Sequence, residues 1–330
     1  MKLQHAPAYG PFAAAFLLAG PLLAAAKTAP RVETKHDEKA GKLVVMIDGK
    51  QALLYRYGDG VDLPYYVPHS PSGKPMTVVR TNPYPHHRSF WFADRVQRAG
   101  QRVGKFYNAL YSRADKKDPN SPFNDRIRHV RLEPPRVTPG RVALVKKLLW
   151  EIDRKTPILD ETRRLTVTAL GGGEYLMDVT FTVTASYGDV AFVSDAVHYA
   201  WPYLRMTTAF SVKGGGTMTN SEGGVNQKGT HGKVATWVDY SNTIGGVAEG
   251  LAVFSHTDNK HPHAWLTRDY GTFGPRRISA RSGKRFTLEK GASLSRRIGV
   301  LVHRGDVRTG KVAQRYAAYV RPAAGGEAQR

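Results

Sequence analysis

EYLMDVTFTVTA, residues 174–185, is the stretch of sequence that decides the fold class. Apolar and polar side chains alternate along it with a period of two, which is the pattern of a strand with one buried face. RLTVTAL (164–170) alternates in the same way and is separated from it by Gly171-Gly172-Gly173. We therefore predict that the two stretches pair as an antiparallel hairpin. The apolar face of the first stretch carries Tyr175, Met177, Val179, Phe181, Val183 and Ala185.

Other apolar runs of strand length extend this pattern along the chain. KLVVMI (42–47), the turn dipeptide Asp48-Gly49 and QALLYRY (51–57) form a hairpin signal. Helical periodicity is limited to 94–111 and 311–320. We predict an all-β protein, an antiparallel β-sandwich with few short helices, of which the mutarotase-like supersandwich is one form. Further strands are expected at 141–152, 190–199, 234–240, 247–255, 284–289 and 296–303.

The beginning of the chain has the features of an export signal. FAAAFLLAGPLLAAA, residues 12–26, follows Lys2, contains Gly20-Pro21 and ends in three alanines, as a secretory signal peptide does. The run is shorter than the roughly 20 apolar residues that a membrane span needs, so no span is expected. A mature protein in the periplasm or outside the cell follows from this. The predicted parts are a signal peptide (1–26, cut near Ala26), a flexible leader (27–41), one β-sandwich domain (42–321) and a flexible tail (322–330).

The composition limits both the chemistry and the partners. The 330 residues include 49 Lys+Arg, 27 Asp+Glu and no Cys, which excludes disulfides, thiolate metal sites and a cysteine nucleophile. A net charge of +22 attracts polyanions such as acidic polysaccharide, peptidoglycan or anionic lipid. Nucleic acid is not expected as a partner, because the chain is predicted to be exported and has no basic helix, finger spacing or RNP-like motif.

The positive charge is concentrated between residues 80 and 131. This stretch holds 12 Lys+Arg against 4 Asp. It is either a solvated basic face, which keeps the protein soluble, or a groove for an anionic substrate.

PYPHHRSFWF, residues 83–92, is the first candidate for chemistry. Its two prolines restrict the loop that carries His86, His87 and Arg88. Histidine transfers protons near neutral pH, and arginine offers a fixed fork for a carboxylate or phosphate. We therefore expect His86 or His87 to be the general acid or base and Arg88 to bind an anionic or enolate oxygen. The alternative is a buried, hydrogen-bonded histidine with Arg88 in an ion pair.

HTDNKHPHAWLTRDYGTF, residues 256–273, is the second candidate. Here Arg268 is expected to bind an anionic oxygen, and Asp269 to orient a histidine or serve as the second acid–base group. Histidines two apart in an extended chain face one side, which suits zinc or copper if a third ligand is near. No cofactor is expected otherwise. If a transition metal binds, its ligands are expected to be His256, His261 and His263.

Aromatic rings in both segments favour a carbohydrate ligand. A ring can lie against the apolar face of a pyranose while a few convergent polar groups bind its hydroxyls. The alternative is that the tryptophans belong to the core. The expected substrate-binding residues are Trp91, Asn259, His261, Trp265 and Tyr270.

Three long motifs in this order resemble a family of secreted bacterial proteins of largely unknown function that is often labelled methane oxygenase PmoA. They are PSGKPMTVVRTNPYPHHRSFWF (71–92), GTHGKVATWVDYSN (229–242) and HTDNKHPHAWLTRDYGTFGP (256–275). The resemblance runs from about Tyr65 to Val320. Tyr84 stands where the family usually has the first histidine of HPHH, and Ser89 stands where the family has the glycine after the arginine. The label names an integral membrane subunit, whereas no membrane span is expected here.

The resemblance implies a β-sandwich and a sugar-directed role. Together with the two candidate segments, it predicts an exported carbohydrate-active protein. The expected chemistry is acid–base elimination, hydrolysis or epimerisation of a sugar or glycoside, which can be acidic or oxidised. Two alternatives remain open. One is a carbohydrate-binding or cell-envelope protein without catalysis, and the other is a metal-dependent oxygenase, as the label suggests.

Overall fold

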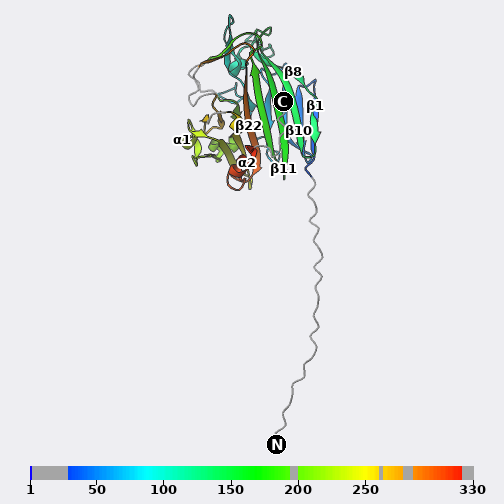
Figure 1. Cartoon of the computed structure of the whole chain (residues 1–330), viewed down its shortest axis with the longest axis vertical. Helices are drawn as coiled ribbons and strands as arrows, with labels where there is room; N and C mark the ends of the chain where they lie inside the picture. Colours follow the sequence, from blue (N-terminus) through cyan, green and yellow to red (C-terminus); the bar gives the residue numbers. More distant parts are fainter. Residues whose placement is uncertain (2–28, 194–199, 260–262, 278–284, 322–330) are drawn as a thin grey trace.

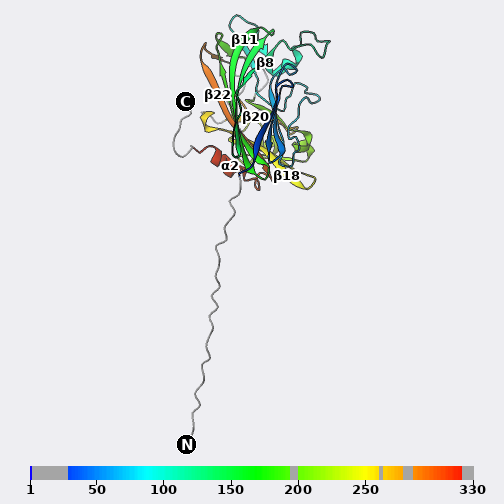
Figure 2. The same ribbon diagram turned by 90° about the vertical axis from the view of Figure 1, so that its right-hand side faces the viewer.

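A computed structural model of the protein describes Met1 and residues 29–193, 200–259, 263–277 and 285–321. These residues form two large sheets and one small sheet. Figures 1 and 2 show the two large sheets facing each other. Their strand pairings are antiparallel, so the predicted all-β antiparallel sandwich is confirmed. Within these ranges, no helix is long and apolar enough to cross a membrane.

The strands of each sheet do not follow their order along the chain. Across the first sheet lie β1 (Val32–Asp37), β2 (Lys42–Ile47), β3 (Lys50–Arg56), β4 (Tyr65–Pro68), β5 (Phe90–Trp91), β14 (Tyr203–Arg205), β20 (Thr272–Pro275), β19 (His263–Thr267) and β16 (Val234–Ala235). Across the second lie β15 (Thr217–Asn220), β17 (Trp237–Ile244), β18 (Val247–Ser255), β22 (Ser293–Arg304), β12 (Glu174–Thr184), β11 (Thr156–Gly171), β10 (Arg141–Ile152) and β8 (Arg126–Leu132), with β9 (Arg136–Thr138) paired to β10. The small sheet contains β21 (Phe286–Leu288), β13 (Val190–Phe192), β6 (Arg95–Arg98) and β7 (Gly104–Lys105).

The helices are short and lie in the connections. They are η1 (Phe106–Tyr111), η2 (Thr208–Phe210), η3 (Val212–Gly214), α1 (Asn226–Thr230), η4 (Thr257–Asn259) and α2 (Val312–Tyr319). Of these, α2 confirms the helical pattern at 311–320. Its residue Val312 is buried against the outer side of the second sheet with Trp237.

The predicted hairpin is present as β11 and β12, with Leu165 opposite Val179 and Val167 opposite Met177. Three consecutive glycines with positive φ turn the chain between the strands, a backbone that other residues rarely adopt. The hairpin at Asp48-Gly49 is also confirmed, since β2 pairs with β3 across it.

One expectation about organisation is wrong, and a second holds only in part. The leader predicted over 27–41 contains a strand, because Val32–Asp37 forms β1 on the edge of the first sheet and pairs with β2. The helical pattern at 94–111 holds only η1, since Arg95–Arg98 forms β6 in the small sheet. In both cases, pairing with a neighbouring strand overrides a weak local pattern.

Apolar side chains from both large sheets fill the space between them. Phe181 of β12 lies 4.8 Å from Phe92 and 6.2 Å from Phe90, measured between ring centroids. Farther along the sandwich, Tyr240 of β17 lies 4.6 Å from Phe273 of β20. These contacts fix which face of each strand in the first sheet points inward.

A buried ion pair ties three strands of the second sheet together. His303 of β22 crosses over Gly250 of β18 and donates from Nε2 to Oδ1 of Asp239 on β17 at 2.8 Å. Its Nδ1 donates to the carbonyl oxygen of Arg304 at 3.0 Å. Both partners are acceptors, so the ring is protonated. A Cβ at Gly250 would lie 2.4 Å from the imidazole, so only glycine leaves room for this crossing.

The pair should make stability depend on pH. Burial alone would lower the pKa of His303, but the charge and hydrogen bond of Asp239, with the Arg304 carbonyl, raise it above 6.5. A raised pKa in the folded state stabilises the protein below the unfolded value of about 6.5, and this stabilisation is lost as pH rises through the folded value. The free energy of unfolding of the wild type, measured in urea, should therefore fall above about pH 6.5 relative to that of His303→Asn. Parallel curves for the two proteins would contradict this assignment.

Candidate functional site

The pairing of strands in the first sheet determines which side chains lie on its outer face. Phe90 of β5 lies opposite Leu204 of β14, which lies opposite Phe273 of β20, and this row faces the core. Side chains alternate along a strand, so the next row faces outward. That row contains Trp91 and its partner Tyr203.

A cavity of about 310 Å³ lies on this outer face. The loop before β5, the helix η1, strand β14 and the β19–β20 connection all contribute to it. The two sequence segments that we singled out, 83–92 and 256–273, therefore meet here. The lining residues are Tyr84, His86, His87, Tyr107, Asn108, Tyr203, Leu266, Arg268, Tyr270 and Thr272.

The two histidines of the cavity have different surroundings. His87 is buried, with Nε2 3.3 Å from the Tyr107 hydroxyl and Nδ1 3.4 Å from the Thr272 hydroxyl. Burial, together with the neighbouring His86 and nearby arginines, lowers the pKa of His87 to about 3, so this ring is neutral. His86 is half-buried, and its Nδ1 lies 3.3 Å from the Tyr111 hydroxyl.

His86 is the better proton acceptor of the two. Burial and the charge of Arg88 lower the pKa of His86 below 6.5, so the ring is neutral at pH 7. No partner of its Nε2 occurs in the described part of the chain. A neutral imidazole with an open nitrogen at a cavity wall is the arrangement of a general base.

Stacked aromatic rings form one wall of the cavity. The ring of Tyr84 lies 5.4 Å from that of Tyr270 and 4.9 Å from that of His87, nearly parallel to both. Burial, with the neighbouring Tyr84, raises the pKa of Tyr270, so its hydroxyl keeps its proton. Both tyrosines line the cavity, so this wall is aromatic and carries phenolic hydroxyl groups.

Two arginines give the cavity a positive potential. Arg268 lines it, and its Nη1 lies 2.8 Å from Nε2 of His231. Arg205 lies behind the wall, 8% exposed, with its guanidinium 4.7 Å from the centre of the Tyr270 ring. Burial lowers the pKa of Arg205. Among the described residues, no carboxylate pairs with either arginine, and no Asp or Glu lines the cavity. The site therefore favours an anionic group.

Arg88 does not line the cavity. It is 1% exposed and donates from Nε to Oδ1 of Asp62 at 3.0 Å, while Nη1 donates to the carbonyl oxygen of Pro85 at 3.0 Å. This ion pair fixes the turn that carries both histidines. The placement fits the ion-pair alternative from the sequence and gives Arg88 a positioning role.

Asp269 is also behind the site. Its Oδ1 accepts a hydrogen bond from the backbone N–H of Gln227 at 2.8 Å, and its own N–H donates to the Gln227 side chain at 3.1 Å. It anchors α1 to the connection that carries Arg268 and Tyr270, and it contacts no histidine of the cavity.

The tryptophans lie away from the cavity wall. Trp91 faces outward but is fully covered, with Tyr203 stacked on it at 4.9 Å. Trp265 lies opposite Pro275 on the inward row, and it donates from Nε1 to the Ala235 carbonyl at 2.8 Å. The next residue of β19, Leu266, reaches the cavity instead.

Asn259 belongs to a different part of the molecule. It follows β18 and binds the backbone of Arg297 on β22 through both its amide nitrogen and its amide oxygen, at 2.8 and 2.9 Å. These bonds hold η4 against the second sheet.

The predicted metal ligands do not form a site among the described residues. His263 is buried in β19, whereas His256 lies beside Asp258 and Tyr319 at the second sheet. His261 is outside the described residues. No group of three His, Cys, Asp or Glu within the described ranges is placed to hold a metal ion.

Several residues of the cavity do not stand out in the sequence. Tyr107 and Asn108 come from η1, where FYNALY has no motif, and Arg205 follows WPYL, which has none either. Tyr84 stands out only as a departure from HPHH. Its place beside two prolines in the histidine loop is the one signal available.

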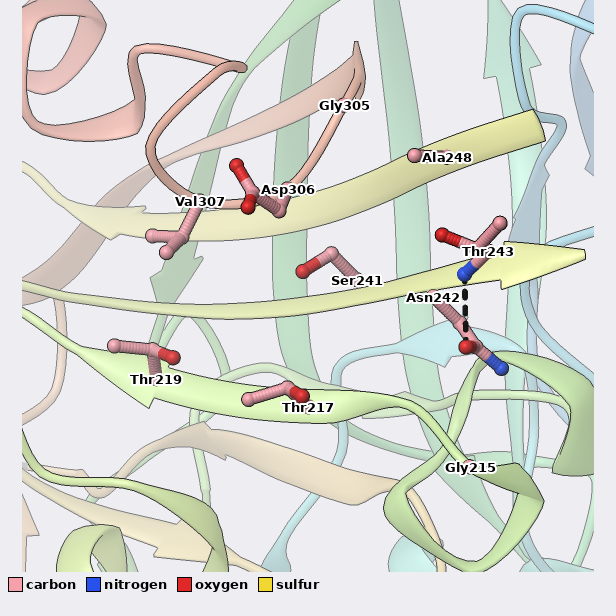
Figure 3. A pocket seen from close by; sticks show the side chains of 10 residues that line it. All are labelled: Gly215, Thr217, Thr219, Ser241, Asn242, Thr243, Ala248, Gly305, Asp306 and Val307. Atoms are coloured by element: carbon pink, nitrogen blue, oxygen red, sulfur yellow. Dashed lines mark hydrogen bonds between the residues drawn. The ribbon is translucent and has the colours of Figure 1, made fainter. Parts of the chain in front are cut away.

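A second cavity, of about 380 Å³, lies on the outer face of β15, β17 and β18, and Figure 3 shows it from close by. Hydroxyl groups of Thr217, Thr219 and Ser241 line its floor, and Asp306 stands at its edge. It has no histidine and no aromatic ring among its lining residues. The first cavity therefore has the stronger chemistry.

Residues 42–317 match the family described as "Family of unknown function (DUF6807)". The chain belongs to this family. No curated protein matches the sequence of this DUF6807 protein.

Three solved structures illustrate what the fold is similar to. The GH36 α-galactosidase AgaA from Geobacillus stearothermophilus is 9% identical with a TM-score of 0.41, and the match covers 85% of this chain and 42% of that one. The galactose 1-epimerase from Lactobacillus acidophilus NCFM is 8% identical with a TM-score of 0.39, covering 84% and 100%. The GalM/aldose epimerase homologue from C. elegans is 9% identical with a TM-score of 0.32, covering 84% and 100%. The DUF6807 protein thus spans less than half the length of the α-galactosidase.

The role of Arg88 can be tested by stability. Arg88→Gln leaves the carboxylate of Asp62 buried without its partner, which should lower the free energy of unfolding by about 3–5 kcal/mol in urea denaturation. Arg31→Gln is the matched control, because the Arg31–Glu33 pair is exposed, and it should cost less than about 1 kcal/mol. If Arg88→Gln were as stable as this control, the positioning role would be wrong.

Proposed function

We propose that the DUF6807 protein is a carbohydrate-active enzyme that removes a proton from a carbon next to a carboxylate or carbonyl group of a sugar. The observation that carries this is the pairing of a neutral, open histidine with two arginines that have no carboxylate partner among the described residues, within an aromatic-walled cavity. A base and a fixed positive charge are what this step needs, because the charge that develops on oxygen must be stabilised.

The residues divide the work as follows. Tyr84 and Tyr270 line the cavity and contact the sugar through their ring edges and hydroxyl groups. His86 takes the proton as the C–H bond breaks, and the electron pair moves toward the carbonyl or carboxylate oxygen. Arg268 stabilises that oxygen, supported by the charge of Arg205 behind the wall.

Elimination completes the reaction on a glycoside with a leaving group at the next carbon. The C=C bond forms as the bond to the leaving oxygen breaks, and the hydroxyl of Tyr107, which contacts His87, gives that oxygen its proton. Both Tyr107 and His86 line the cavity, and their ring centroids are 5.2 Å apart. The acid and the base are therefore close enough to act on one substrate. Return of a proton to the opposite face of the same carbon would give epimerisation instead.

The cavity favours these reactions over hydrolysis. Most glycosidases use two carboxyl groups, one on each side of the bond that breaks. No Asp or Glu is among the described residues that line this cavity. A histidine–tyrosine pair therefore supports proton abstraction better than it supports hydrolysis.

The test is turnover of a panel of uronic oligosaccharides, 3-keto glycosides and unmodified glycosides. Products are identified by mass spectrometry, where elimination leaves the total mass unchanged and hydrolysis adds water. Turnover of an acidic or oxidised member without addition of water is expected. Binding without turnover of any member would replace the enzyme by a carbohydrate-binding protein, and no binding at all would refute the sugar-directed role.

His86→Ala should lower kcat about 100- to 10,000-fold while affinity is kept, because only the proton acceptor is lost. The lowered pKa of His86 keeps the base neutral at and above pH 6.5, so protonation of His86 should make kcat/KM of the wild type fall on the acid side of that value. His36→Ala on β1, at the edge of the sheet, is the control and should leave turnover unchanged. Equal rates for both variants would exclude His86 as the base.

A further inference from the structure

A further hollow, separate from the cavity of Figure 3, adjoins the candidate site at η1. It has a volume of about 660 Å³, roughly twice that of the first cavity. Asn108 lines both this hollow and the histidine cavity. Tyr111 lines this hollow, and its hydroxyl contacts His86 of the histidine cavity. The residues that line it are Arg102, Val103, Lys105, Asn108, Tyr111, Ser112, Arg113, Lys116, Asn124 and Asp125.

The lining of this hollow is strongly basic. It holds four cationic side chains and one carboxylate, that of Asp125. Arg102 forms an ion pair with Asp125 and a second one with Asp153, in which its Nη2 lies 2.7 Å from Oδ1. The charge of Arg102 is therefore compensated. No carboxylate pairs with Lys105, Arg113 or Lys116 anywhere in the described part of the chain.

The positions of these three cations differ in rigidity. Arg113 donates to the backbone oxygen of Ser121 and lies over the ring of Phe123, 4.2 Å from its centre. Its guanidinium is therefore held in place before any ligand binds. Lys105 and Lys116 are exposed at the rim, where their long side chains can follow a flexible anion.

We propose that the two hollows form one groove for a polymeric, negatively charged glycan, with Lys105, Arg113 and Lys116 binding the carboxylates of the units next to the reacting one. This rests on the proposed function. It names the substrate class as an acidic oligosaccharide or polysaccharide of uronic acid units. Three separate cations in a hollow larger than the reaction cavity match a chain with one charge on each unit better than they match a single small anion.

The proposed groove also offers a function for the positive charge that is concentrated in residues 80–131. A face kept only for solubility needs no hollow, no arginine fixed on an aromatic ring and no connection to a histidine cavity. Exposed cations raise the local concentration of a polyanion and guide it to the site. Contacts to several units then add to the binding of the one that reacts.

The experiment compares a tetramer of hexuronic acid with the same tetramer after reduction of its carboxyl groups to alcohols. The variant is Lys105→Glu/Lys116→Glu, and the control is Lys50→Glu/Lys290→Glu, which changes the net charge equally at exposed positions of β3 and of the loop before β22. Thermal unfolding of each variant confirms that it is folded.

For the wild type and the control, we expect the tetramer to bind well and its reduced form to bind poorly. In Lys105→Glu/Lys116→Glu, KM for the tetramer should rise about tenfold with kcat nearly unchanged, and raising the salt concentration should weaken its binding less than that of the wild type. The activity on a single 4-O-methyl uronide, whose methoxy group at C4 is the leaving group next to the acidic C–H bond, should be the same in all three proteins; this compound is the methyl uronide of the test. The KM of Lys105→Gln/Lys116→Gln for the tetramer should lie between that of the wild type and that of the charge-reversed variant.

Three results would overturn the groove while leaving the proposed function intact. They are equal KM values for the variant and its control, equal binding of the reduced tetramer, and tighter binding of inorganic polyphosphate than of the tetramer by a protein that still turns over the methyl uronide. If the wild type acts on neither the tetramer nor the methyl uronide, and on no other member of the panel, the proposed function itself fails.

Discussion

The apolar layer between the two large sheets is the constraint on which the rest of the structure depends. Once Phe181 and Phe90 pack in this layer, the alternation of side chains along each strand leaves no freedom in where their neighbours point. Trp91 must then face outward and Trp265 inward, although both belong to motifs of similar appearance. The cavity of the first sheet is a consequence of this packing, because its floor consists of the rows that the core does not use.

Buried and half-buried polar contacts position the parts of the site that are not on strands. The Arg88–Asp62 ion pair fixes the histidine loop, and Asp269 fixes the connection between β19 and β20 through Gln227. Neither touches the cavity. Breaking the buried Arg88–Asp62 pair costs more than forming it gains, so this pair holds one loop conformation more than it adds stability. This division leaves His86 and Arg268 able to meet a ligand while the residues next to them in sequence hold the backbone.

Charge in this protein has two distinct uses. Arg88, Arg102 and Arg297 have carboxylate partners and belong to the fold. By contrast, Arg205 and Arg268 at the cavity have no carboxylate partner within the described residues, which leaves a positive potential there. The proposed chemistry needs such a potential where an oxygen becomes negative. The hollow beside η1 also contains cations of the second kind, because Lys105 and Lys116 lack acidic partners among the residues that the structure describes.

The sequence by itself determined the fold class, because the alternation in 164–170 and 174–185 depends only on neighbouring residues and has one physical solution. It also brought out the two segments that meet at the cavity. It could not decide which of their residues reach it: Leu266 lines the cavity and Trp265 does not, a difference of one residue that strand register alone controls. Tyr107 and Arg205 come from stretches without a pattern, and the partners of Arg88 and Asn259 are far away in the chain. Those contacts exist only after the sheets have packed, because distance in space, not in sequence, governs hydrogen bonds and ion pairs.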